Sequence, residues 1–162
     1  MLQGVTESNG IGWSLDGGTM YYVDSGEEVP RVRAFPFYLK TGELGVPEDF
    51  IVPSHDEGVP DGLTVDEQGC IWIAFWGGGT LKRYMPSGRL LESFAVPVTF
   101  PTCPGFGGRS LDYLYLTTAW EGLDERARQA ETSAGHLLGA SIGVHGRLAF
   151  RYGREGDPIL ST

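Results

Sequence analysis

Two stretches of this chain can be laid over each other, NGIGWSLDGG (residues 9–18) and DGLTVDEQG (residues 61–69). Each is followed at once by a run rich in aromatic and β-branched residues, TMYYV (19–23) and CIWIA (70–74). A short strand, a tight turn with Gly or Asp and a second strand are typical of a β-hairpin. The pattern returns in weaker form as TCPGF (102–106), a turn at 107–110 and YLYLT (113–117). The equivalent residues Asn9, Asp61 and Thr102 therefore mark an internal repeat.

A second hairpin pattern follows each of the first two. Residues 32–37 lead through a turn at Gly42 to residues 44–50, and residues 81–84 lead through a turn at Gly88 to residues 90–94. Four short strands over about 40–50 residues make a unit of the size of a propeller blade.

The chain is therefore expected to be all-β, a single partial β-propeller domain over residues 1–162 with about three to three and a half four-stranded blades. The predicted blades and tail are residues 5–53, 54–97, 98–153 and 154–162. The last blade is expected to contain a polar loop with one helical turn at 121–134 and final strands at 136–138 and 148–150. A closed propeller needs at least four blades, so we expect either a homodimer that closes the ring or a fragment of a longer chain.

The composition argues against some partners. A net charge of -9 repels phosphate backbones and anionic lipid, so neither nucleic acid nor a membrane is an expected partner. No signal-like segment and no run of roughly 20 apolar residues is present, which favours a cytoplasmic protein. Cys70 is expected to be a buried thiol, and a bridge from it to Cys103 stays open.

An ordered set of short motifs resembles the C-terminal half of the six-bladed senescence marker protein (SMP-30), regucalcin and gluconolactonase family. The motifs are SNGIGWSLD (8–16), YYVDS (21–25), VPDGLTVD (59–66), IWIA (71–74), GG (78–79), FGG (106–108), LYLTTA (114–119) and GHL (135–137). Each motif is weak alone, but together they cover nearly the whole chain in order.

The resemblance implies hydrolysis of a sugar lactone with one divalent metal ion. The family's Asn in S-N-G and Asp in P-D-G map onto Asn9 and Asp61 as metal ligands, whereas its first-blade Glu has no counterpart in this chain. Oxygen ligands of this kind suit Ca²⁺ best, and Zn²⁺, Mg²⁺ or Mn²⁺ can be accommodated. Asp61 is also the expected catalytic base toward a bound water.

Other interpretations of these residues stay open. Asn-Gly and Asp-Gly are also the commonest hairpin-turn dipeptides. Thr102 and His55 are candidates for lining the same channel, and Trp76 and Trp120 for reaching its rim. Aromatic residues that recur at blade spacing are expected in the core; they are Trp13, Tyr22, Trp72 and Tyr115.

The sequence thus predicts a divalent-metal-dependent sugar lactone hydrolase in a truncated form with an incomplete site. The alternative is a non-catalytic calcium-binding or interaction protein.

Overall fold

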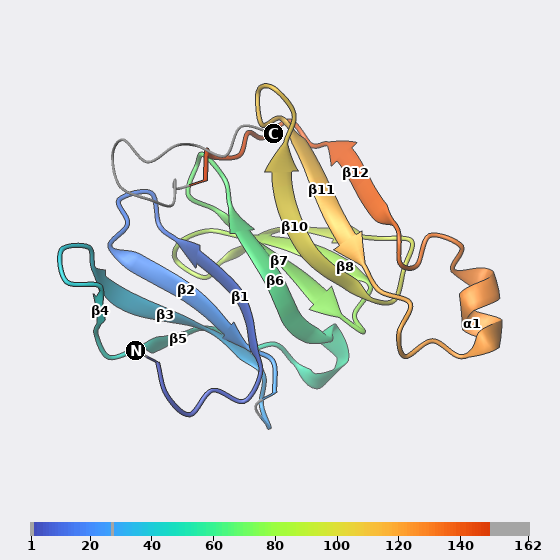
Figure 1. Ribbon diagram of the computed structural model, residues 1–162, viewed down its shortest axis with the longest axis horizontal. Helices are drawn as coiled ribbons and strands as arrows, with labels where there is room; N and C mark the ends of the chain where they lie inside the picture. The colour runs from blue at the N-terminus through green and yellow to red at the C-terminus, as the bar shows by residue number, and fades with distance from the viewer. Residues whose placement is uncertain (1, 27, 150–162) are drawn as a thin grey trace, which may run out of the picture.

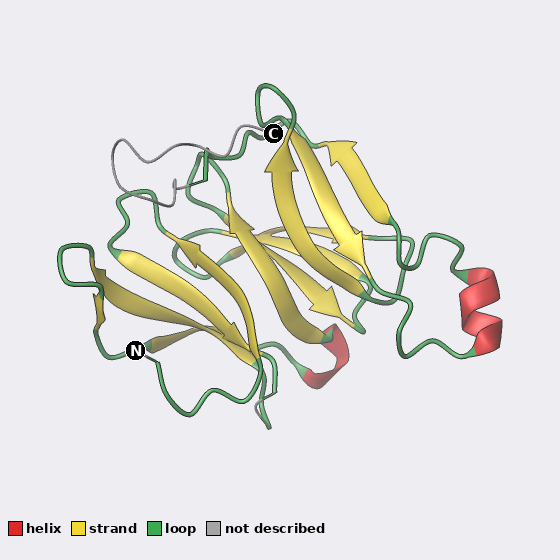
Figure 2. Ribbon diagram, in the orientation of Figure 1, coloured by secondary structure: helices red, strands yellow, loops and turns green. Residues whose placement is uncertain are grey.

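The computed structural model describes residues 2–26 and 28–149 as three antiparallel sheets arranged side by side (Figures 1 and 2). The first sheet holds β1 (Ser8–Trp13), β2 (Thr19–Asp24), β3 (Arg31–Tyr38), β4 (Glu43–Leu44) and β5 (Glu48–Ile51). The second holds β6 (Val59–Val65), β7 (Ile71–Trp76), β8 (Thr80–Tyr84) and β9 (Leu90–Ala95), and the third holds β10 (Pro101–Gly107), β11 (Tyr113–Thr118) and β12 (Leu137–Ser141). The helical segments are η1 (His55–Glu57) and α1 (Glu125–Ala130). The expected all-β partial propeller is confirmed.

The repeated hairpins form where the sequence places them. Between β1 and β2 the Gly17 amide donates to the Ser14 carbonyl at 2.9 Å, and between β6 and β7 the Gly69 amide donates to the Asp66 carbonyl at 3.0 Å. Both glycines have positive φ, 69° and 80°, a conformation that side chains with a Cβ rarely adopt. The two glycines therefore fix equivalent turns in the first two sheets.

Most of the core lies in the two seams between neighbouring sheets, and a smaller cluster of Met20, Tyr22 and Phe35 lies within the first sheet. One cluster joins the first sheet to the second and includes Tyr21, Val23, Leu63 and Ile73. The other joins the second sheet to the third through Trp72, Ala74, Leu81, Leu114 and Leu116. Apolar burial is the main favourable term in folding, so these seams hold the sheets in place. The innermost strands β1, β6 and β10 consequently lie next to each other in Figure 1.

Each innermost strand carries a bulge at the same point. The register against the partner strand shifts between Ser8 and Ile11 in β1, between Pro60 and Leu63 in β6, and between Pro101 and Pro104 in β10. The bulges enclose Asn9-Gly10, Asp61-Gly62 and Thr102-Cys103. The hairpin-turn interpretation of the first two dipeptides is therefore wrong, because packing between sheets holds them in bulged strands.

The glycine after Asp61 allows two of these strands to approach closely. A Cβ added at Gly62 would lie 2.5 Å from the Cys103 Cβ and 2.6 Å from its Cα, on β10. Gly10 has the same role one sheet earlier, because a Cβ there would lie 2.5 Å from the Asp61 carbonyl oxygen. Glycine, which has no side chain, is thus required at these two positions where the inner strands are in contact.

We expect Gly62→Ala to lower the free energy of unfolding by about 1–3 kcal/mol, because β6 and β10 must separate to admit the methyl group. Gly105→Ala on β10 is the matched control, since a Cβ there has no neighbour within 4 Å. Urea denaturation of both variants measures the difference. Equal stability of the two variants would contradict the close approach.

The third sheet departs from expectation in two ways. Leu148 and Ala149 form no strand, and Leu148 is 83% exposed, so the predicted strand at 148–150 is wrong over these two residues, while Phe150 and the predicted tail lie outside the described residues. Tyr115, expected in the core, is 38% exposed, because it lies on the face of β11 opposite the buried Leu114 and Leu116. Pairing of two chains to cover that face stays a prediction.

The remaining expectations concern the loops and cysteines. A helix of six residues, α1, lies in the polar loop where one helical turn was expected. Cys70 is buried and both cysteines are free thiols, so the bridge between them is not formed. None of the described helices is long and apolar enough to span a membrane.

Candidate metal centre

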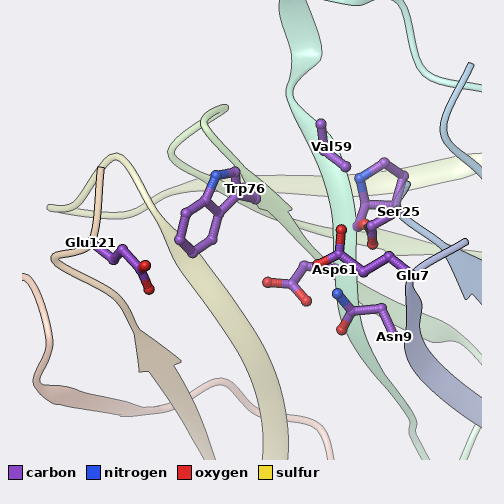
Figure 3. Close-up of a pocket in the computed structure, with 8 residues that line it drawn as sticks. Glu7, Asn9, Ser25, Val59, Asp61, Trp76 and Glu121 are labelled. Atoms are coloured by element: carbon purple, nitrogen blue, oxygen red, sulfur yellow. Dashed lines mark hydrogen bonds between the residues drawn. The ribbon is translucent and has the colours of Figure 1, made fainter. Parts of the chain in front are cut away.

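A cavity of about 440 Å³ opens where the first two sheets meet the loop after β11. Its lining residues are Glu7, Asn9, Ser25, Val59, Pro60, Asp61, Trp76 and Glu121. Figure 3 shows Asn9 and Asp61 next to each other on one side, with Trp76 between them and Glu121 in that view. The structure thus brings the two predicted metal ligands together although 52 residues separate them in the sequence.

The backbone around Asn9 and Asp61 is fixed by polar contacts. The buried Asp24 carboxylate accepts hydrogen bonds from the amides of Thr6 at 2.9 Å and Glu7 at 2.8 Å, three and two residues before Asn9. The Ser25 hydroxyl donates to the Pro60 carbonyl at 2.8 Å, directly before Asp61. The end of β2 therefore holds both bulges, and the site is built on strands, which gives its ligands defined positions.

The electrostatics of the site favour a cation. Burial raises the pKa of the Asp61 carboxyl from its ordinary value of 3.8 to about 6. A hydrogen bond with the Asn9 side chain and the Gly62 amide act in the opposite direction, while the nearby Glu7 carboxyl raises the pKa further. Burial and like charge both disfavour the ionised carboxylate, and an added cation would relieve both effects.

We expect the metal-free chain to lose stability as this carboxyl ionises. The folded chain binds the proton more tightly than the unfolded chain, so the stabilisation is complete below pH 3.8 and is lost as the pH rises through about 6. Because the cavity is open to solvent, we expect a change of about 1–2 kcal/mol. Urea titrations in a chelator at pH 5 and pH 7.5 measure it. Asp61→Asn should abolish the Asp61 part of the change, and an unaltered pH dependence in that variant would contradict the assignment.

The donors in this chain fit a cation that prefers oxygen. Asn9 offers an amide oxygen and Asp61 a carboxylate, as hard divalent ions require. Among residues 2–26 and 28–149, no group of three His, Cys, Asp or Glu side chains is placed to hold a metal ion. Asn9 and Asp61 stay the predicted ligands, one neutral and one charged.

The other residues singled out from the sequence lie in different surroundings. Thr102 occupies the third bulge, and its hydroxyl is 2.6 Å from that of Thr117 on β11. His55 is exposed on η1. Neither is among the residues that line the cavity, so a channel role for them stays a prediction. Trp76 lines the cavity as expected, whereas Trp120 is 56% exposed and packs against Arg128.

Sequence reasoning missed Glu7, Ser25 and Glu121. Glu7 and Ser25 flank the repeated hairpin on either side, so their positions next to Asn9 follow from the pairing of Ser8 with Asp24. Glu121 comes from a loop after β11 that has no counterpart in the repeat. The register of the first hairpin predicts that Glu7 lies near Asn9. No such pairing predicts that Glu121 lies near the cavity.

Comparisons with known proteins identify the family of this chain. Residues 1–120 match the family described as SMP-30/Gluconolactonase/LRE-like region. The pentonolactonase of Haloferax volcanii is 36% identical over 152 residues, which cover 91% of this chain and 52% of that protein. Regucalcin of Danio rerio is 35% identical over 147 residues, which cover 90% of this chain and 49% of that protein.

A solved structure is similar over the same extent. Regucalcin from Agrobacterium tumefaciens, a calcium-binding protein, superposes with a TM-score of 0.82 at 36% identity, covering 88% of this chain and 48% of the other. The chain spans about half the length of the curated relatives it matches. On the family match and these relatives, the chain belongs to the SMP-30/gluconolactonase/LRE-like family.

Proposed function

We propose that this chain contributes Asn9 and Asp61 to a divalent-metal site that hydrolyses sugar lactones. The observation that carries the proposal is the placement of the two residues in equivalent bulges, side by side in one cavity. The relatives that act on sugar lactones, among them the Haloferax pentonolactonase, supply the reaction class. Ca²⁺ is the ion that the oxygen donors fit best, with Zn²⁺, Mg²⁺ and Mn²⁺ as alternatives.

The chemistry follows from the two side chains. When bound, the ion supplies Lewis-acid polarisation of the lactone carbonyl. Asn9 would hold it through its amide oxygen and Asp61 through its carboxylate. Asp61 also accepts a proton from the attacking water as general base. The water oxygen bonds to the carbonyl carbon and the ring C–O bond breaks. The proton taken by Asp61 passes to the leaving ring oxygen, which becomes a hydroxyl, and the carbonyl carbon becomes that of a carboxylic acid.

Lactone hydrolysis releases acid, so the proposal can be tested at constant pH by base consumption. The chain should hydrolyse five- and six-carbon sugar lactones faster than buffer when Ca²⁺, Mn²⁺ or Zn²⁺ is present, and at the buffer rate with a chelator. Asp61→Asn should remove the metal-dependent rate, while Asp112→Asn, an exposed acid in the turn before β11, should keep it. Equal rates with and without metal would overturn the proposal.

A second candidate is calcium binding without turnover. The observations in its favour are that the chain spans about half of its relatives and that only one of the two proposed ligands, Asp61, is a carboxylate. Under this alternative, Ca²⁺ binds weakly in calorimetry, no lactone is hydrolysed above the buffer rate, and Asp61→Asn affects binding only.

A further inference from the structure

The wall of the cavity opposite Asn9 and Asp61 is built from two side chains of different chemistry. Trp76, at the end of β7, presents an indole, and Glu121, in the loop after β11, presents a carboxylate. Figure 3 shows both turned toward the same space as Asp61. Among residues 2–26 and 28–149, no Lys, Arg or His forms an ion pair with Glu121.

The indole of Trp76 is held in place by a second aromatic ring. It stacks on Phe100 with the ring centroids 4.4 Å apart and the planes 30° from parallel. Phe100 covers part of the indole, and Trp76 remains half-buried as part of the cavity wall. A ring fixed by packing loses little freedom when a ligand binds, which favours affinity.

The same phenylalanine supports the loop that carries Glu121. A Cβ added at Gly122 would lie 3.4 Å from the Phe100 ring, and Gly122 has a φ of 87° that favours glycine. The Ala119 amide donates to the Phe100 carbonyl at 2.9 Å, and the Thr99 amide donates to the Glu131 carboxylate at 2.6 Å. The loop is therefore attached on both sides of Glu121 to the segment that also supports Trp76.

The guanidinium of Arg128, which follows Glu121 in the sequence, contacts groups other than Glu121. Arg128 lies 4.3 Å from the Trp120 ring, and its Nε donates to the Leu123 carbonyl at 3.0 Å. Arg128 is thus engaged with Trp120, the residue directly before Glu121. Trp76 and Trp120 therefore differ in their contacts, although both lie at or just after the end of an aromatic strand. Trp76 lines the cavity, and Trp120 packs against Arg128.

We infer that Trp76 and Glu121 form the subsite that binds the polyhydroxylated ring of the substrate. A sugar ring has an apolar C–H face and a rim of hydroxyl groups, so it needs an aromatic surface and a hydrogen-bond acceptor at once. The indole takes the C–H face, and the Glu121 carboxylate accepts hydrogen bonds from ring hydroxyls. A cavity of about 440 Å³ is large enough for one such ring.

This assignment rests on the proposed function for the position of the lactone carbonyl, which is placed at Asn9 and Asp61. The ring then lies across the cavity, with its carbonyl at the metal ligands and its hydroxyl rim at Glu121. Trp76 and Glu121 are binding residues in this arrangement, and the metal does not touch them.

The experiment measures binding of gluconic acid δ-lactam, which has the ring and hydroxyls of the lactone but an amide in place of the ester. Titrations of the chain are followed by tryptophan fluorescence and by saturation transfer from protein to lactam in NMR. The variants are Trp76→Leu, Trp76→Phe and Glu121→Gln. Tyr38→Leu and Glu125→Gln are the controls, because both residues are exposed and outside the cavity lining.

We expect Trp76→Leu to weaken lactam binding roughly three- to tenfold and Trp76→Phe to recover most of it. Glu121→Gln should weaken binding roughly tenfold, because a charge-assisted acceptor is lost. The controls should bind like the parent chain. Calcium affinity should stay within about twofold of the parent in all five variants, since none of the changed residues is a proposed ligand.

The possible results distinguish the proposed sugar-ring subsite from the proposed lactone hydrolysis. Lactam binding that depends on Trp76 and Glu121, in a chain that hydrolyses no lactone, would support the subsite and overturn the proposed function. Metal-dependent hydrolysis with the same KM in Trp76→Leu, Glu121→Gln and the parent chain would overturn the subsite and keep the proposed function. Absence of lactam binding at millimolar concentration would overturn the subsite in either case.

Discussion

Asp66→Ala is expected to lower the free energy of unfolding by about 3–5 kcal/mol, because it leaves a buried guanidinium without its buried carboxylate partner. Asp66 is completely buried in the turn between β6 and β7, and Arg83 on β8 is 5% exposed. Two hydrogen bonds join them, from the Arg83 Nε at 2.9 Å and from Nη2 at 2.7 Å.

The Asp66 carboxylate also organises the turn and the adjoining strand. It accepts hydrogen bonds from the amides of Gln68 and Cys70, both at 2.9 Å, and from the Trp72 indole at 3.0 Å. Trp72 belongs to the seam between the second and third sheets, so loss of Asp66 also disturbs the packing of that seam. Several buried donors lose their acceptor together, which explains the size of the expected effect.

Urea denaturation followed by tryptophan fluorescence measures this change. Glu92→Gln is the control, since Glu92 is the exposed partner of the same guanidinium at 3.2 Å and a surface pair contributes less than about 1 kcal/mol. A loss below about 1 kcal/mol in Asp66→Ala, or equal losses in the two variants, would show that the buried pair does not stabilise the second sheet.

Asp61→Asn is expected to weaken divalent-cation binding at least about a hundredfold, because the variant keeps the shape of the side chain and removes its charge. The same change should raise the stability of the metal-free chain above pH 6, since a carboxylate that burial disfavours has been removed. Opposite signs for binding and stability are typical of a functional residue held at an unfavourable position.

Calorimetric titration with Ca²⁺ and urea denaturation in a chelator measure the two effects. Asp112→Asn is the control and should change neither quantity appreciably, since the residue is exposed in the turn before β11. Equal Ca²⁺ affinity in Asp61→Asn and the parent chain would exclude Asp61 as a ligand, whatever its effect on stability.

The sheets could be predicted from the sequence because their signals are local. Alternating apolar residues and the glycines of the turns, such as Gly17 and Gly69, specify each hairpin before any packing is considered. The repeat also shows that Asn9 and Asp61 occupy the same position in neighbouring units. Residues at the same position of neighbouring units are expected to lie close together. The local sequence is misleading at Asn9-Gly10 and Asp61-Gly62, because both dipeptides are typical of hairpin turns. The structure places them in strands, because Gly10 and Gly62 fit against the adjacent inner strand, and that contact depends on the whole fold.

The rest of the site could not be predicted because no repeat carries it. Trp76 is the last residue of a strand, and its role depends on Phe100, which lies 24 residues further on. Glu121 depends on a loop whose path is fixed by contacts with residues 99 and 100. The exposure of Tyr115 likewise depends on what covers the third sheet, and the pattern of β11 contains no information about that.

The most direct test of the metal site is to locate a bound ion by NMR, with Mn²⁺ as a paramagnetic substitute for Ca²⁺. We predict that substoichiometric Mn²⁺ broadens the amide signals of Asn9, Gly10, Asp61 and Gly62 first, that excess Ca²⁺ restores them, and that Asp61→Asn abolishes the broadening. Broadening centred on the acidic residues of η1 or on the loop before α1, and unchanged by Asp61→Asn, would contradict the assignment of Asn9 and Asp61 as the metal ligands.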